Sequence, residues 1–248
     1  MSRSNPVVQL VNLSRRSFRQ SLEVQDKLKN DLVKLRLGDS QALPIKKEHH
    51  TKPFDEKSKH YVLFVEHFPV YTSGLRDKAF SQEDIARLEG LGAEVCRTNR
   101  GGLATFHGPG QLVAYPILNL KELGIGLRQY VAKLERCLVQ TCKSFGIDAY
   151  TNDLTGVWAK DCKIASIGVN AKRHITSHGV ALNCSNDLSW FDHITPCGLE
   201  DVAMTSLTEQ TGQLVDVREA EWSFLKTFIE EFGVSIVSRS DSTPAISP

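Results

Sequence analysis

Strand-like and helical segments are mixed along this chain without the regular strand–helix–strand alternation of a doubly wound fold. Short apolar or alternating stretches predict strands at residues 7–10, 61–66, 93–98, 111–118, 156–159, 163–170, 175–183 and 234–237. Apolar residues at helical spacing predict helices over residues 14–38, 81–90, 127–145 and 217–232. This order favours an α+β fold, a mixed sheet with helices, over a doubly wound one.

The chain of 248 residues contains no internal repeat and no linker that divides it. We therefore expect one domain over residues 1–237. Residues 39–59 are polar, contain two prolines and predict an exposed loop, and residues 238–248 predict a disordered tail.

The charge balance argues against nucleic-acid binding, because 30 Lys and Arg residues stand against 29 Asp and Glu residues. The longest apolar stretches, such as residues 61–65, are far shorter than the ~20 residues of a membrane-spanning helix. Six cysteines without a CxxC pair or a secretory signal indicate reduced thiols in an intracellular compartment.

Arginines dominate the N-terminus, where Arg3, Arg15, Arg16 and Arg19 precede the first acidic residue, Glu23. This bias would suit a mitochondrial presequence. The solvated face of a helix explains it equally well, and the sequence leaves both readings open.

Residues 100–111, with the sequence RGGLATFHGPGQ, concentrate glycines between two predicted strands. Glycines allow a backbone to approach a ligand closely, and Arg100 could hold an anionic or carbonyl group. The spacing is that of neither a dinucleotide-binding nor a P-loop motif. A tight structural turn, in which His107 only bonds to the backbone, is the competing interpretation.

Cys197 is a candidate nucleophile because it lies between Pro196, which stiffens the turn, and Gly198, which adds no side chain. A neighbouring cation would lower the pKa of its thiol and produce the reactive thiolate. Lys163, at the start of a predicted strand, is the candidate partner. From spacing alone, a surface lysine and a core cysteine remain the more ordinary reading.

A metal site was weighed and is disfavoured, although six possible ligands lie within residues 162–197. Only His174 and His178 have the spacing of a ligand pair, and in an extended strand they would lie far apart. The other possible ligands are Cys162, Cys184, His193 and Cys197.

Three runs make the sequence similar to a known family, the lipoyl(octanoyl) transferases, and above all to their animal mitochondrial members. They are RGGLATFHGPGQ at residues 100–111, KIASIG at residues 163–168, and residues 174–197, which begin HITSHGVALN and end with the first four residues of ITPCG. The weaker similarity covers residues 7–237 and omits the loop at 39–59. The resemblance implies the fold of the biotin and lipoate protein ligases and a mitochondrial location.

The resemblance also assigns roles: Cys197 accepts the acyl group and Lys163 lowers its pKa. It places the substrate pocket at Arg100, Gly101, Gly102, Leu103, Ala104, Thr105, Phe106, His107, Ser166, Ile167, Gly168, Gly179, Val180 and Ala181. Leu103, Ile167, Val180 and Ala181 are the apolar candidates to line the acyl chain.

The implied reaction moves an octanoyl group from octanoyl-acyl carrier protein to a lysine of a lipoyl domain, through a thioester on the enzyme. The acceptors would be the E2 subunits of 2-oxoacid dehydrogenases and the glycine cleavage H protein. We expect no cofactor, because one thioester replaces another of similar energy. The alternatives are an ATP-dependent lipoate or biotin protein ligase and a non-catalytic acyl-binding scaffold.

Overall fold

The computed structural model describes residues 5–36, 60–76, 80–195 and 202–238. Its elements, in chain order, are β1 (Val7–Arg16), α1 (Phe18–Arg36), β2 (Tyr61–His67), β3 (Val70–Ser73), α2 (Gln82–Gly90), β4 (Glu94–Arg97), β5 (Thr105–His107), β6 (Gln111–Ile117), α3 (Leu127–Ser144), β7 (Ala149–Tyr150), β8 (Val157–Ala159), β9 (Cys162–Lys172), β10 (Ile175–Asn183), η1 (Leu188–His193), α4 (Leu207–Thr211), α5 (Val217–Phe232) and β11 (Ser235–Ser238).

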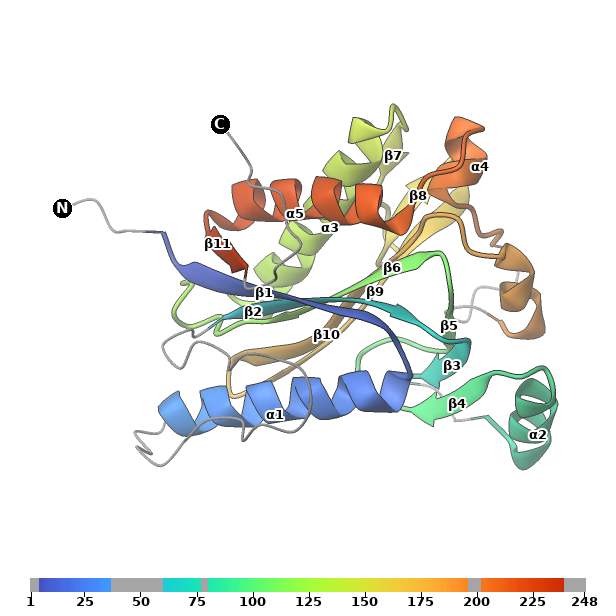
Figure 1. The fold of residues 1–248 in the computed structure, drawn as a ribbon, viewed down its shortest axis with the longest axis horizontal. Helices are drawn as coiled ribbons and strands as arrows, with labels where there is room; N and C mark the ends of the chain where they lie inside the picture. Colours follow the sequence, from blue (N-terminus) through green and yellow to red (C-terminus); the bar gives the residue numbers. More distant parts are fainter. Residues whose placement is uncertain (1–4, 37–59, 77–79, 196–201, 239–248) are drawn as a thin grey trace.

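Most strands join one mixed sheet of eight in the order β11-β1-β2-β6-β10-β9-β8-β7. β1 is parallel to β11 and β2, and the neighbours from β2 to β7 are antiparallel. A small sheet, β4-β3-β5, stands at one end of the large one (Figure 1). The mixed sheet flanked by helices is the predicted fold class.

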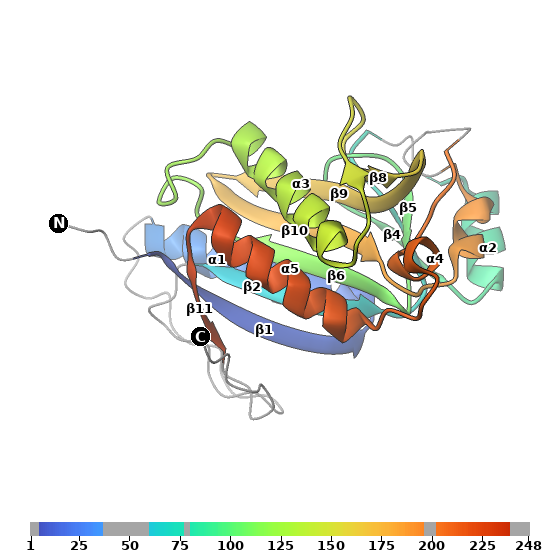
Figure 2. The same ribbon diagram turned by 90° about the horizontal axis from the view of Figure 1, so that it is seen from above.

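Helices cover both faces of the large sheet (Figures 1 and 2). α3 and α5 lie together on one face, where Val62, Phe64 and Leu112 point into their core. α1 lies on the other face, where Leu63, Val113 and Tyr115 point toward it. Alternate residues of each strand thus enter two cores, as the pleat of a strand requires.

The predicted start of the first helix at residue 14 is wrong, because β1 continues to Arg16 and α1 begins at Phe18. Ser14 has a φ of 53°, and the pairing of β1 with β2 shifts register between Asn12 and Arg15. A bulge of this kind lets the strand resume after the irregularity. The helix was predicted to begin too early because the bulge interrupts the alternation of apolar and polar residues by which the end of β1 would be recognised.

Several short elements were not predicted. β5 lies inside the glycine-rich run that was expected to be a loop. No element was predicted at the positions of β3, β7, η1 and α4. By contrast, α5 and β10 have the predicted bounds, and Ser81 caps α2 in a capping box with Asp84. Long periodic segments were therefore predicted better than segments of two to six residues.

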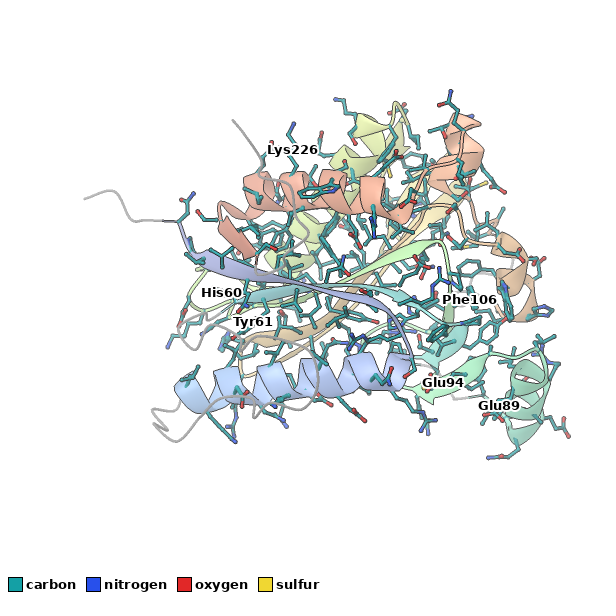
Figure 3. The ribbon with its side chains drawn as sticks, viewed as in Figure 1. His60, Tyr61, Glu89, Glu94, Phe106 and Lys226 are labelled. Atoms are coloured by element: carbon teal, nitrogen blue, oxygen red, sulfur yellow. The ribbon has the colours of Figure 1, made fainter. Side chains whose placement is uncertain are left out.

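The N-terminal arginines have structural partners in the folded chain. Arg15 pairs with Glu66 of β2, and Arg16 donates to the Leu13 carbonyl. Arg19 pairs at 2.6 Å with Glu94 of β4, which is labelled in Figure 3. These contacts within the fold explain the presence of the three arginines without requiring that they serve as a mitochondrial targeting signal. Arg3 and the predicted loop at 39–59 lie outside the described residues. So does the predicted tail at 238–248 apart from Ser238, where the prediction is wrong because Ser238 is the last residue of β11. Across the described residues, none of the helices combines the length and the apolar character that crossing a membrane would demand.

Candidate active site

A cavity lies on the α1 face of the large sheet, with about 450 Å³ of unoccupied space including its open mouth. Its wall is formed by the loop before β5, by β5 and β6, by the middle of β9 and β10, and by the first residue of α1. The lining residues are Phe18, Arg100, Gly102, Leu103, Thr105, His107, Val113, Tyr115, Ser166, Ile167, Gly168, His178, Gly179, Val180 and Ala181.

Three of the predicted pocket residues lie outside this lining. The Gly101 amide donates to the Val169 carbonyl at 2.9 Å, which ties the loop to β9. Ala104 is buried, and Phe106 stacks on Trp190 with ring centroids 5.1 Å apart (Figure 3). The other predicted residues meet around the cavity although they come from three separate runs of sequence.

Arg100 holds the glycine-rich loop in place. Its guanidinium donates to the Thr72 carbonyl and hydroxyl, both at 2.8 Å, and to the Gly101 carbonyl at 3.0 Å. A Cβ on Gly74 would lie 2.3 Å from the Gly102 carbonyl oxygen, so only glycine permits this approach. Arg100 was predicted to hold a ligand group, and the structure shows it organising one wall of the cavity.

Four lining residues were not predicted: Phe18, Val113, Tyr115 and His178. The first three lie in segments whose periodicity indicated only core packing. His178 was considered only as a metal ligand. Nothing in a linear pattern distinguishes an apolar residue that packs from one that borders a cavity.

His178 breaks the alternation of β10. A regular strand would turn its side chain to the face opposite Ala181, but its φ is 56° and its ring lies beside Tyr115, with centroids 6.4 Å apart. Its amide donates to Gln25 of α1 at 2.7 Å, and its Nε2 bonds to Asn99 Oδ1 at 2.8 Å. Left-handed backbone in a residue other than glycine costs free energy and is found most often at functional sites.

The histidines at this cavity are held neutral. Burial lowers the pKa of His107 to about 3, and the pKa values of His67 and His178 to about 4. His67 lies behind the lining, where its Nε2 bonds to the Tyr115 hydroxyl at 2.8 Å. Arg100 is therefore a charged lining residue beside imidazoles that carry no charge at neutral pH.

Lys163 is buried, with 2% of its surface exposed, and is the second residue of β9. Its Nζ donates to the Thr155 carbonyl at 3.2 Å and lies 5.5 Å from the centroid of the Trp158 ring. The cavity-lining Ser166 follows three residues later on the same strand, about 10 Å along it. A lysine buried to this extent is unusual, because lysines are almost never fully buried unless they are paired.

The chain that follows Cys197 is anchored directly to Lys163. The Lys163 amide donates to the Ala203 carbonyl at 2.9 Å, and the Thr205 amide donates to the Lys163 carbonyl at 3.0 Å. Asn183 of β10 also donates to the Thr205 carbonyl at 2.9 Å. Cys197 itself is outside the described residues, so its contact with Lys163 stays a prediction.

Gly156 makes room for the Lys163 side chain. Its φ is 134°, and a Cβ built on it would lie 2.7 Å from Lys163 Cε and 2.8 Å from the Ala165 carbonyl oxygen. Sequence reasoning missed this residue. A glycine before a short strand gave no signal, because the side chain that it accommodates comes from the next strand.

The cysteines of the described residues are free thiols, and most are poor nucleophile candidates. Burial raises the pKa values of Cys96 and Cys142 to about 12 and those of Cys137 and Cys184 still further. Thiols of this kind carry almost no thiolate at neutral pH.

Over the described ranges, no group of three or more His, Cys, Asp or Glu residues could hold a metal ion. His174 lies in the turn after β9, Cys184 is in the core, and His193 ends η1. The possible ligands considered from the sequence are thus dispersed, apart from Cys197, which is not described.

Comparison with known proteins decides the family. The model of the lipoyl protein ligase A/B catalytic domain matches residues 40–229. The chain belongs to this family. A mitochondrial octanoyl-acyl-carrier-protein:protein N-octanoyltransferase of Danio rerio is 47% identical over 81% of this chain and 91% of its own. The Homo sapiens protein of the same name is 51% identical over 68% and 74% of the two chains, and an octanoyltransferase of Bacteroides fragilis is 40% identical over 69% and 81%.

These relatives make the chain an acyltransferase. The names of the Danio rerio and Homo sapiens proteins confirm the expected mitochondrial location. Among solved structures, a lipoate-protein ligase A bound with ATP has a TM-score of 0.67 at 13% identity, covering 96% of this chain and 90% of its own. A lipoate complex of P. falciparum LipL1 has a TM-score of 0.65 at 14% identity, covering 94% and 66%. At such low identity these structures support the fold alone.

Proposed function

We propose that this octanoyltransferase works through a thioester on Cys197, with Lys163 as its proton partner. The observation that carries the proposal is the buried Lys163 ammonium, whose backbone is tied to the chain segment that follows Cys197. The apolar cavity that opens beside the same strand would hold the octanoyl chain.

In the first step the Cys197 thiolate attacks the carbonyl carbon of the octanoyl-carrier thioester. A new C–S bond forms, the carrier thiolate leaves, and the Lys163 ammonium gives that thiolate a proton. The two thioesters have similar energies, so the step needs no ATP. An ammonium within contact of Cys197 would favour its thiolate form before the attack.

In the second step the neutral amine of the target lysine attacks the enzyme thioester. A C–N bond forms, the bond to Cys197 sulfur breaks, and Lys163, now an amine, takes the proton that the attacking nitrogen loses. The products are an octanoyl amide and the original pair of thiolate and ammonium.

The names of the relatives imply an acyl carrier protein as donor and a protein as acceptor. We propose the lipoyl domains of 2-oxoacid dehydrogenase E2 subunits and the glycine cleavage H protein as the acceptors. Each would present its target lysine to the cavity. A catalytic domain spanning residues 1–237 would be sufficient for both steps.

The test is to incubate the full chain with octanoyl-acyl carrier protein in the absence of ATP and to weigh the intact protein. We expect a hydroxylamine-sensitive octanoyl adduct in the wild type, and at least about a 10³-fold loss of transfer in Cys197→Ser. Cys142→Ser is the matched control, because burial raises the pKa of the Cys142 thiol to about 12 and leaves it almost unreactive at pH 7. This variant should still form the adduct. Full turnover by Cys197→Ser, or an adduct that requires ATP, would overturn the proposal.

A further inference from the structure

The cavity crosses the large sheet instead of following one strand. Its lining runs from Ser166 on β9, over Val180 on β10, to Val113 and Tyr115 on β6. These strands are consecutive neighbours, so the path from β9 to β6 covers two inter-strand spacings, or about 10 Å.

The far end of this path is closed by aromatic rings. Phe18, the first residue of α1, lies parallel to the His107 ring, with centroids 6.2 Å apart. It also touches His67 of β2, the next strand beyond β6, with centroids 5.3 Å apart. Phe18 is almost fully buried, so it fills the space where the cavity would otherwise continue beneath β2.

The rings of this end wall hold one another in place. His67 Nδ1 bonds to the Arg16 carbonyl at 3.2 Å and its Nε2 to the Tyr115 hydroxyl at 2.8 Å. His107 Nδ1 bonds to Gln111 at 2.8 Å. Rings fixed in this way cannot rotate aside at low cost, so the wall gives a definite length to whatever enters.

The wall is also uncharged at neutral pH, because burial lowers the pKa values of His67 and His107 far below 7. An uncharged aromatic surface suits a terminal methyl group. It does not suit a polar or ionised chain end.

We infer that Phe18 is the residue that limits acyl chain length, by closing the end of the cavity that lies farthest from β9. The inference rests on the proposed function, because the acyl chain must start on the Lys163 side of the cavity. It assigns a specificity-determining role to a residue of α1 that lies far from the reacting atoms.

The test compares carrier-protein thioesters of 6, 8, 10 and 12 carbons and measures the rate of acyl-enzyme formation by intact mass. In Phe18→Leu we expect the ratio of the decanoyl to the octanoyl rate to rise roughly tenfold, the value of two further buried methylenes. In Phe18→Trp the octanoyl rate should fall relative to the hexanoyl rate. Phe18→Met, of similar volume, replaces the leucine variant if that one does not fold.

Phe64→Leu is the matched control, because Phe64 is an equally buried ring of β2 that faces α5 on the opposite side of the sheet. It should lower stability without altering the chain-length ratio. A folded Phe18→Leu protein with the wild-type ratio would overturn the inference.

Binding of free fatty acids of 6 to 12 carbons, followed by calorimetry, separates this inference from the proposed reaction. If the wild type forms no acyl-enzyme, the proposed function is wrong. The longest fatty acid that binds, and its change in Phe18→Leu, can still be measured by calorimetry. A binding limit that Phe18→Leu leaves unchanged contradicts the inference.

Discussion

The two faces of the large sheet are both closed by helices, yet they bury different kinds of groups. On the α3 and α5 face the buried hydroxyls have partners: Thr141 donates to the Cys137 carbonyl at 2.7 Å, and Thr227 to the Phe224 carbonyl at 2.9 Å. On the α1 face, Gln25 Nε2, Ser177 Oγ and His178 Nδ1 are buried with no hydrogen-bond partner among the described residues.

Unpaired buried polar atoms and empty space both cost stability. Among the described residues, the three unpaired atoms named above and the cavity lie on the same, α1, face of the sheet. We infer that the α3 and α5 face mainly stabilises the fold, while the α1 face gives up part of that stability to keep a ligand site open. Substitutions should therefore separate into those that change stability and those that change rate.

Among the substitutions that compare the two faces, Lys163→Met should have the largest effect. Loss of the ammonium raises the pKa of the Cys197 thiol, and we expect acylation at pH 7 to slow by about 10²-fold. The pH profile of iodoacetamide labelling of Cys197 should move upward. Cys142→Ala, on the α3 and α5 face, should instead lower the urea midpoint and leave the labelling profile unchanged. An unaltered labelling profile in Lys163→Met would contradict the proposal that Lys163 lowers the pKa of the Cys197 thiol.

A smaller effect is expected from Gly156→Ala, whose new Cβ would press on Lys163 Cε. The strained backbone and the displaced ammonium should slow acylation about tenfold and cost about 1–3 kcal/mol of stability. Gly92→Ala is the matched control: Gly92 also has a positive φ, but nothing lies within 4 Å of its Cβ position. It should lose stability while the rate per folded molecule is kept. Equal rates in both variants would show that Gly156 does not position Lys163.

The smallest effect concerns pH. His67, His107 and His178 have pKa values of about 3 to 4 in the folded chain, against an ordinary value of 6.5. Below pH 6.5 the unfolded chain therefore binds more protons, and the free energy of unfolding should fall as pH drops from 6.5 toward 4. Each histidine contributes at most about 1.4 kcal/mol per pH unit.

Urea midpoints at pH 7.5, 6.5 and 5.5 measure this slope. His67→Gln should reduce it by the share of one histidine, whereas Thr141→Val should shift stability by the same amount at every pH. A wild-type midpoint that stays constant from pH 7.5 to 5.5 would contradict the assignment of neutral histidines to the α1 face.

Sequence periodicity predicted the long elements well because each presents many repeats of one pattern. α5 and β10 have the expected bounds, and the capping residues of α2 were identified from Ser81 and Asp84. β1 was truncated because its bulge at Ser14 interrupts alternation. Strands of two to four residues, such as β3, contain too few positions for a pattern to emerge.

The candidate site was predicted in part for a different reason. The run at residues 100–111 was notable for its glycines, and the resemblance to the lipoyl(octanoyl) transferases indicated the other lining residues within 163–168 and 174–197. Phe18 and Val113 were missed because their local sequence is that of ordinary core residues. Gly156 was missed because the side chain that it accommodates, Lys163, belongs to another strand.

The sequence alone therefore determined the class of fold, the family and the motif residues, because local periodicity and motif composition are written in consecutive positions. The tertiary structure was needed to show which residues meet around the cavity and where the cavity ends. It was also needed to show which imidazoles are neutral. These properties depend on contacts and burial between segments as distant as Phe18 and His107, and no linear pattern encodes distances through space.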